Sequence, residues 1–283
     1  MHSPTTSGVA GASGVGGDEV IAQPDHQRSA LQSTRRVWPL DRSAGTALVV
    51  AYAAIFAVLL CVGMLIVHAL DHSALQRVDV RIAHWFDARR TSGRNDAAQI
   101  GAGLADAYTL TPAVIILVIA FAIVWRRWHD SVMLATALLL EKALFLPVSL
   151  LVDRPRPPVV QLDGNPPTSS YPSGHVAAAV AAYVSLAIIV GWHTRNRVVR
   201  AVFFTLAVTA PIVVAVARLH LGMHHLSDVV IGGAAGLVCV LVTLHILRSS
   251  VSRLALTRRS TLPSCVLALD VSDLRDDDLG RTR

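Results

Sequence analysis

The sequence predicts an all-α fold, a polytopic membrane bundle with six transmembrane helices. Hydrophobic residues make up 53% of the 283 residues and charged residues only 16%, whereas about a quarter of the residues in an ordinary soluble domain are charged. Six apolar runs are each long enough to cross a hydrocarbon core of about 30 Å. They lie near residues 44–69, 108–125, 131–152, 175–192, 201–217 and 227–247.

A polar segment, residues 1–43, precedes the first apolar run. It is rich in Gly, Ser, Thr, Ala and Gln and has no apolar periodicity, so we expect a disordered cytoplasmic tail. No small-residue cleavage site clearly follows the first run, which we therefore interpret as a retained span and not as a signal peptide. Residues 44–247 would form the membrane domain. Residues 248–283 would form a second cytoplasmic tail, with a short membrane-surface helix expected near 250–258.

Arginines precede the first apolar run, lie between the second and third runs and between the fourth and fifth, and follow the sixth. Arginines near the ends of membrane spans favour the cytoplasmic side. The residues concerned are Arg35, Arg36, Arg42, Arg126, Arg127, Arg195, Arg197, Arg200, Arg248, Arg253, Arg258 and Arg259. We therefore expect both termini to lie in the cytoplasm. The expected location of the protein is the plasma membrane. The loops 70–107, 153–174 and 218–226 would then face outward.

The first outward loop contains one helical pattern. Leu75, Val78, Ile82, Trp85 and Phe86 recur at the spacing of one helical face, which predicts an interfacial amphipathic helix between residues 72 and 90. The rest of this loop gives no clear prediction.

The formal net charge of +6 does not indicate a nucleic-acid partner, because the charges flank apolar spans and do not form one basic, aromatic-lined surface. The bilayer is the expected partner. Cys61, Cys239 and Cys265 have no short pairing spacing, so neither a disulfide framework nor a zinc site is indicated. Oligomeric state is not predicted.

Polar groups gather in the second and third outward loops, and ionisable groups beside a bilayer mark functional candidates. Arg156 and Arg218 each offer a planar fork of donors that suits phosphate oxygens. Ser173 and Gly174 begin the fourth span, where free backbone N–H groups and the positive end of the helix dipole favour an anion. These four residues predict a phosphate-binding site.

Two histidines and an aspartate accompany this site. Asp228 follows His224 by four residues, which on a helix places both side chains on one face, so the carboxylate could bind one ring nitrogen and leave the other as a nucleophile. His175 remains to protonate a leaving alkoxide. The catalytic candidates are thus His224, His175 and Asp228.

The sequence resembles the type 2 phosphatidic acid phosphatase family, the membrane-bound lipid phosphatase branch of the superfamily that includes the vanadium haloperoxidases. The family's Pro-Ser-Gly-His block is present from Pro172 to His175. Its third block is matched by Arg218, His224 and Asp228, with Ala217 where serine is usual. Its first block is matched by Arg156-Pro157, with Ser149 where lysine is usual. The resemblance covers residues 130–247.

The resemblance implies a membrane phosphatase that hydrolyses a lipid phosphate or pyrophosphate monoester at the outer face, through a phosphohistidine on His224 and without a metal or other cofactor. Two alternatives stay open. The phosphoryl group could pass to a lipid or polyol acceptor, which would make a transferase, or the site could only hold an anionic lipid in a binding protein or transporter. Which lipid phosphate is the substrate is not predicted.

Several nearby residues invite other interpretations. Lys142 lies two helical turns before Ser149 and about 10 Å deeper, so we do not expect it to replace the family lysine. Glu141 and Lys142 are expected to satisfy polar partners inside the bundle; the alternative is that Glu141 belongs to a polar network below the site. Arg154 is expected to be an interface anchor or an indirect contact. His220, His224 and Asp228 recur at four-residue spacing and could hold a metal, but Gly222 between them argues against one continuous helix.

Overall fold

The protein is described here by a computed structural model that covers residues 42–70, 73–164 and 167–261, with side chains described as far as residue 250. Within these residues the fold is entirely helical and has no β-strand, which confirms the predicted class. Most of the two expected tails, residues 1–41 and 262–283, lies outside the described residues.

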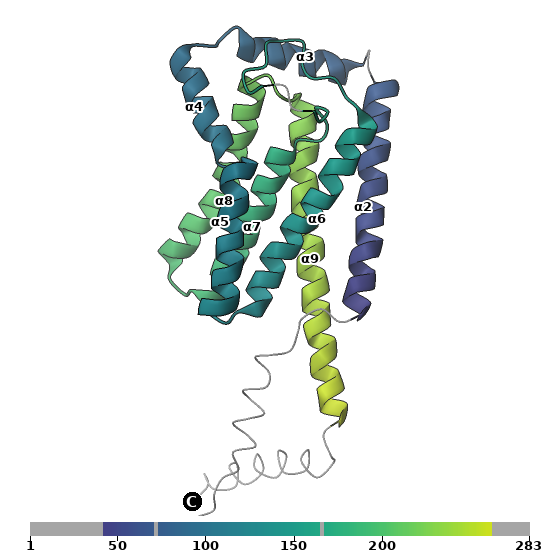
Figure 1. The fold of residues 1–283 in the computed structure, drawn as a ribbon, viewed down its shortest axis with the longest axis vertical. Coiled ribbons are helices and arrows are strands. Elements are labelled where there is room, and N and C mark those ends of the chain that lie inside the picture. Colours follow the sequence, from purple (N-terminus) through teal and green to yellow (C-terminus); the bar gives the residue numbers. More distant parts are fainter. Residues whose placement is uncertain (1–41, 71–72, 165–166, 262–283) are drawn as a thin grey trace, which may run out of the picture. The chain divides into compact units, whose positions relative to one another are not determined.

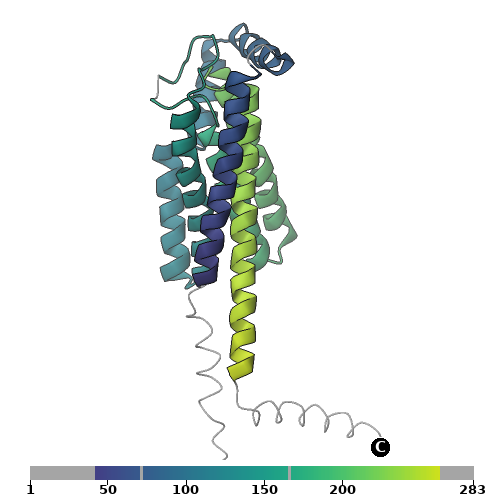
Figure 2. The ribbon, with the colours of Figure 1, turned by 90° about the vertical axis from the view of Figure 1, so that its right-hand side faces the viewer.

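Six helical segments are long and apolar enough to cross a membrane, and each overlaps one predicted span (Figure 1). They are α2 (Arg42–His68), α6 (Trp128–Val152), α7 (Gly174–His193), α8 (Arg197–His220), the first part of α9 (Leu226–Thr261), and the run of α4 (Ser92–Gly103), α5 (Ala107–Ile119) and the π-helix η2 (Ala120–Val124). The chain is therefore a multi-pass membrane protein. The surface helix expected near 250–258 is the continuation of α9, which extends past the ends of its neighbours (Figure 2).

The predicted amphipathic helix is present as α3 (Ala74–Asp87) and lies across one end of the bundle in both views (Figures 1 and 2). Ser73 caps it, because its side chain accepts a hydrogen bond from the backbone N–H of Gln76. Leu75, Val78 and Trp85 are exposed. The helix therefore turns apolar side chains outward, as an interfacial helix does.

Helix α4 was not predicted from the sequence. It begins after Thr91, whose side chain accepts from the backbone N–H of Arg94, and it buries Ala98, Gly101 and Ala102. These residues pack against α8, and a Cβ on Gly101 would lie 3.3 Å from the Cβ of Ala217. Small side chains let the two helix backbones approach closely.

Helix α7 is surrounded by α6, α8 and α9, and small residues set its distance from α9. Cβ atoms on Gly232 and Gly236 would lie 2.5 Å from the carbonyl oxygen of Ser173 and 2.4 Å from that of Ala177. No side chain fits in these gaps. The spacing of the two glycines is that of close helix pairs in membranes, and it holds the start of α9 against the start of α7.

The connection between α8 and α9 reverses the chain in five residues, 221–225. Gly222 adopts φ of +73°, a left-handed conformation that glycine accepts without strain. The loop 153–173 lies against this turn, because the backbone N–H of Leu162 donates to the carbonyl of Leu221 at 3.0 Å. Both outward loops predicted to carry chemistry thus meet at the α3 end of the bundle.

Candidate active site

The two sequence blocks that carry the predicted catalytic residues are bonded to each other. The backbone N–H of Ser173, at the start of α7, donates to the carbonyl of Asp228 in the first turn of α9 at 3.1 Å. Tyr171 anchors the same loop to α2, because its hydroxyl donates to the carbonyl of Leu59 at 2.9 Å. The loop before α7 is therefore held from two sides.

His224 lies in the turn before α9 and is buried, with 5% of its surface exposed. Its Nδ1 lies 2.6 Å from the carbonyl oxygen of Ser170. A carbonyl only accepts hydrogen bonds, so Nδ1 must carry the proton and Nε2 is left with a free lone pair. Burial, followed by the charge of Arg218, lowers the pKa of His224 to about 3. At neutral pH the ring is therefore uncharged and has the tautomer that a nucleophile requires.

The predicted hydrogen bond between Asp228 and His224 is not found among the described residues. Asp228 accepts from the backbone N–H of His225 at 2.8 Å and from the Ser170 hydroxyl at 2.5 Å, and its Oδ2 lies 3.2 Å from Nδ1 of His225. The physical reason is that α9 begins only at Leu226, so His224 precedes the helix and does not share a helical face with Asp228. The group that contacts Nδ1 of His224, and so orients the ring, is the Ser170 carbonyl and not Asp228.

Two arginines stand beside the histidine. Arg218 is buried in the last turn of α8 and forms an ion pair with Asp163, while its Nε is buried without a hydrogen-bond partner in the described part of the chain. Arg156 is half-buried and donates to the carbonyls of Met223 at 2.5 Å and Thr168 at 3.1 Å. Burial lowers the pKa of Arg156, and the charge of Arg218 lowers it further. Two cations that repel each other favour an anion between them.

The start of α7 supplies neutral groups. Ser173 is fully buried, makes no side-chain cap and has a hydroxyl without a partner among the described residues. A Cβ on Gly174 would lie 2.8 Å from the Phe145 ring, so a larger residue at this position would require the ring to move. His175 follows in the first turn and is partly exposed. The free hydroxyl and the unpaired backbone N–H groups of a helix start are donors suited to phosphate oxygens.

Arg154 was expected to be an interface anchor or an indirect contact, and the structure buries it. Its exposed fraction is 4%, and its guanidinium forms ion pairs with Asp228 and with Asp79 of α3. Sequence reasoning missed Asp79. The signal was present, because Asp79 lies on the same helical face as Leu75 and Ile82, and a charge among apolar positions indicates a buried partner.

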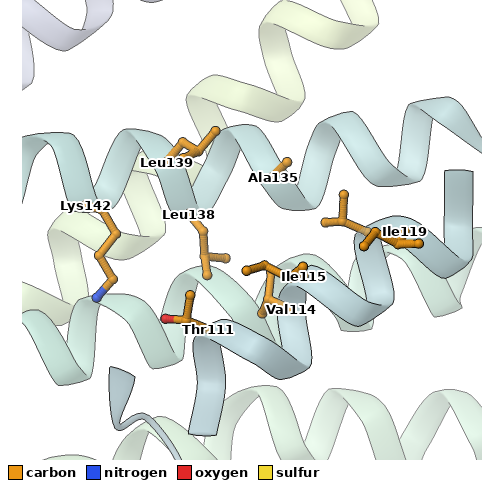
Figure 3. A pocket seen from close by; sticks show the side chains of 9 residues that line it. Thr111, Val114, Ile115, Ile119, Ala135, Leu138, Leu139 and Lys142 are labelled. Carbon is orange, nitrogen blue, oxygen red and sulfur yellow. The ribbon is translucent and has the colours of Figure 1, made fainter. Parts of the chain in front are cut away.

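Ser149 does not supply a cation. It is buried, and its hydroxyl donates to the carbonyl of Leu146 in its own helix at 2.9 Å. Lys142 forms an ion pair with the neighbouring Glu141 at 3.6 Å. Lys142 also lies at one end of a cavity of about 280 Å³ between α5 and α6, close to Thr111 (Figure 3). The other side chains that line this cavity are apolar.

The metal interpretation of His220, His224 and Asp228 required one continuous helix. Instead, α8 ends at His220 and α9 begins at Leu226. His220 points elsewhere, with its Nε2 2.9 Å from the side-chain oxygen of Asn95 in α4. The three residues do not share a helical face.

The fold and the site together define a polytopic helical membrane protein with a buried histidine and two arginines at one end of the bundle. Residues 130–251 match the family model of the PAP2 superfamily. This match confirms the resemblance predicted from the three motif blocks.

Two solved structures resemble the chain. The first transmembrane PAP2 type phosphatidylglycerolphosphate phosphatase from Bacillus subtilis is 21% identical, with a TM-score of 0.61, and the match covers 70% of this chain and 96% of that one. LpxE from Aquifex aeolicus is 23% identical, with a TM-score of 0.45 and a match covering 59% and 94% of the two chains. At 21% identity, the likeness to the Bacillus subtilis structure shows a shared fold and nothing more. No curated protein matches the chain significantly.

Proposed function

We propose that the protein is a membrane phosphatase that hydrolyses a lipid phosphate or lipid pyrophosphate monoester through a phosphohistidine on His224. One observation carries the proposal: a buried, uncharged imidazole with Nδ1 bonded to a carbonyl lies beside two arginines. This arrangement combines a nucleophile with a site for the anion it attacks. The match of residues 130–251 to the family model of the PAP2 superfamily supports it.

In the first step Nε2 of His224 attacks phosphorus, and the bond from phosphorus to the ester oxygen breaks. His175, whose protonated form is favoured by the negative charge of the bound phosphate, gives its proton to the departing oxygen, so the lipid leaves as a neutral alcohol or, from a pyrophosphate, as a lipid phosphate. Arg156, Arg218 and the hydroxyl of Ser173 hold the equatorial oxygens, on which charge is spread. No metal is required for this step.

In the second step a water molecule attacks the phosphohistidine. His175, now neutral, takes a proton from the water, the bond between phosphorus and Nε2 breaks, and inorganic phosphate leaves. His224 returns to its starting tautomer because Nδ1 keeps its proton throughout. The Ser170 carbonyl stabilises the positive charge that the ring carries while Nε2 is phosphorylated.

The surroundings of the site suit an amphipathic substrate. The cavity between α5 and α6 has an apolar lining that fits a hydrocarbon chain and a single cation, Lys142, at one end (Figure 3). A lipid could therefore place its chain in the bundle wall and its phosphate at the site.

We propose that the site faces the non-cytoplasmic side of the plasma membrane. The connections at the other end of the bundle, between η2 and α6 and between α7 and α8, carry Arg126, Arg127 and Arg195 (Figure 1). Arginines near short connections favour the cytoplasm. The end that holds His224 would then face outward.

The test is phosphate release by detergent-purified protein in EDTA, across a panel of lipid phosphates and diphosphates. His224→Ala should abolish release, and His129→Ala, which changes an exposed histidine of α6, should leave it intact. Loss of release in EDTA would instead favour a metal-dependent hydrolase. Release that depends on an added alcohol would favour a phosphoryl transferase, and lipid binding that survives in His224→Ala without any release would favour a binding protein.

A further inference from the structure

We propose that Asp79 of α3 is a positioning residue for His224 and acts through Arg154, Asp228 and Ser170. The inference rests on the function proposed above, because it concerns the same nucleophile. Helix α3 contributes no residue to the three sequence blocks, and most of its surface is turned away from the bundle. Asp79 is nevertheless 1% exposed, and its hydrogen-bond partners, Ser227 and Arg154, both lead toward the site.

Asp79 holds the beginning of α9. Its Oδ1 accepts the backbone N–H of Ser227 at 3.0 Å, and its Oδ2 accepts the Ser227 hydroxyl at 2.5 Å. The first N–H groups of a helix have no partner within the helix, and the helix dipole favours a negative charge beside them. A carboxylate from α3, 148 residues away in sequence, thus fixes the first turn of the helix that carries Asp228.

Arg154 carries the connection onward. One of its nitrogens, Nη2, donates to Oδ2 of Asp79 at 2.9 Å. The other, Nη1, donates to Oδ1 of Asp228 and, at 2.7 Å, to the Ser227 hydroxyl. A rigid planar guanidinium that bridges two buried carboxylates fixes their relative positions, so a change at Asp79 alters the geometry and the charge that Asp228 experiences.

Ser170 is the last link. Its hydroxyl donates to Oδ2 of Asp228 at 2.5 Å, and its backbone N–H donates to the carbonyl of Arg154 at 2.9 Å. Its own carbonyl oxygen lies 2.6 Å from Nδ1 of His224. Arg154 and Asp228 therefore hold the residue whose carbonyl determines the tautomer and the direction of the nucleophile.

These contacts predict which kinetic constant changes. Among the described residues Asp79 bonds Ser227 and Arg154 and not Arg156, Arg218 or Ser173, so Asp79 should affect attack by His224 and not phosphate binding. Misplacement of a nucleophile lowers the rate of the chemical step. Loss of the Asp79 carboxylate should therefore lower kcat and leave KM and the inhibition constant of inorganic phosphate unchanged.

The test uses the full-length protein in detergent. Asp79→Asn should lower kcat by about tenfold or more, with the same loss in the single-turnover rate of phosphoenzyme formation. Asp79→Glu, which keeps the charge, should recover part of the activity. Asp87→Asn is the matched control, because Asp87 is also a carboxylate of α3 paired with an arginine, Arg90, and should leave kcat unchanged.

A double variant tests the route. Ser170→Ala removes the hydroxyl that bonds Asp228 but keeps the carbonyl that bonds His224. If Asp79 acts through Ser170, adding Ser170→Ala to Asp79→Asn should lower kcat by less than about twofold beyond the worse single variant. Losses that multiply would overturn the route.

The outcomes separate this inference from the proposed function. No phosphate release by the unaltered protein from any lipid would defeat the proposed function. Release by the unaltered protein with an unchanged kcat in Asp79→Asn would defeat the inference alone, as would a weaker phosphate inhibition with unchanged kcat. Should Asp79→Asn fail to fold, Asp79→Glu decides: a reduced kcat with unchanged phosphate inhibition supports the positioning role, and an unchanged kcat refutes it.

Discussion

Arg218 and Asp163 form an ion pair in which the arginine side chain is 3% exposed and the aspartate 38% exposed. The cation proposed to hold phosphate thus already has a carboxylate partner, which reaches it from the loop between α6 and α7. A substrate phosphate would have to compete with this carboxylate for the same donors. Asp163 therefore bonds a donor of Arg218 that the proposed phosphate oxygens would also use.

Removing this competitor should strengthen anion binding. We expect Asp163→Asn to lower the inhibition constant of inorganic phosphate about fivefold, because a partly exposed ion pair contributes about 1 kcal/mol. Competitive inhibition assays measure it. Asp96→Asn, which removes an exposed carboxylate of α4, gives the same change in net charge and should have little effect. An equal gain in both variants would attribute the effect to overall charge.

The pH dependence of stability follows from His224. Its pKa is about 3 in the folded protein, mainly because of burial, against an ordinary value of 6.5. Between these values the unfolded chain binds more protons, so the free energy of unfolding falls as the pH falls from 6.5 toward 3. Above 6.5 this contribution no longer changes with pH.

Replacing His224 with a residue that does not titrate should remove that contribution. In His224→Asn an amide N–H can still donate to the Ser170 carbonyl, and we expect its thermal unfolding temperature to fall less than that of the unaltered protein between about pH 6.5 and pH 4. His129→Asn, at an exposed position, should behave like the unaltered protein. Parallel curves for all three proteins would contradict the assigned burial effect.

Ser149 offers a gain-of-function experiment. It is buried in the last turn of α6, where the family resemblance places a lysine, so Ser149→Lys should add a cation and raise kcat/KM about fivefold, as expected for about 1 kcal/mol of added charge stabilisation. Ser149→Met has a side chain of similar length without charge and should lack this gain. Unchanged turnover in Ser149→Lys across the lipid panel would show that the existing cations suffice.

The contact between α7 and α9 predicts a difference between neighbouring glycines. Gly232→Ala places a Cβ 2.5 Å from the carbonyl of Ser173 and should cost about 1–3 kcal/mol of stability, because helix backbones must shift. Gly233→Ala meets Val176 at 3.6 Å, an ordinary contact, and should be tolerated. Thermal unfolding and phosphate release would check both variants, and similar losses in the two would contradict the close approach at Ser173.

Hydropathy predicted the six spans because a backbone in lipid must satisfy its own hydrogen bonds, which leaves helices as the available structure. The predicted spans differ from the structure mainly at their ends. Helix α4 was not predicted because its buried residues, Ala98, Gly101 and Ala102, are small and give no apolar periodicity. Its position depends on α8, which is distant in sequence.

The candidate site was predictable where residue type alone indicates chemistry, as for His224, Arg156 and Arg218. It was not predictable where geometry depends on the starting residue of a helix. The expected pairing of Asp228 with His224 assumed a helix through both residues. Because α9 begins at Leu226, Asp228 bonds His225 and Arg154 instead. The burial of Asp79 was predictable from its place on the apolar face of α3, but its partner Ser227, 148 residues away in sequence, was not.

The acceptor for Nδ1 of His224 is a peptide oxygen of Ser170, and every amino acid carries that atom. No point substitution can delete it, so alanine scanning across the loop would leave the tautomer of the nucleophile unaltered unless the path of the main chain changed. Redesign of the proposed enzyme for another reaction would therefore have to treat the loop conformation, and not a side chain, as the variable that determines the direction of the imidazole.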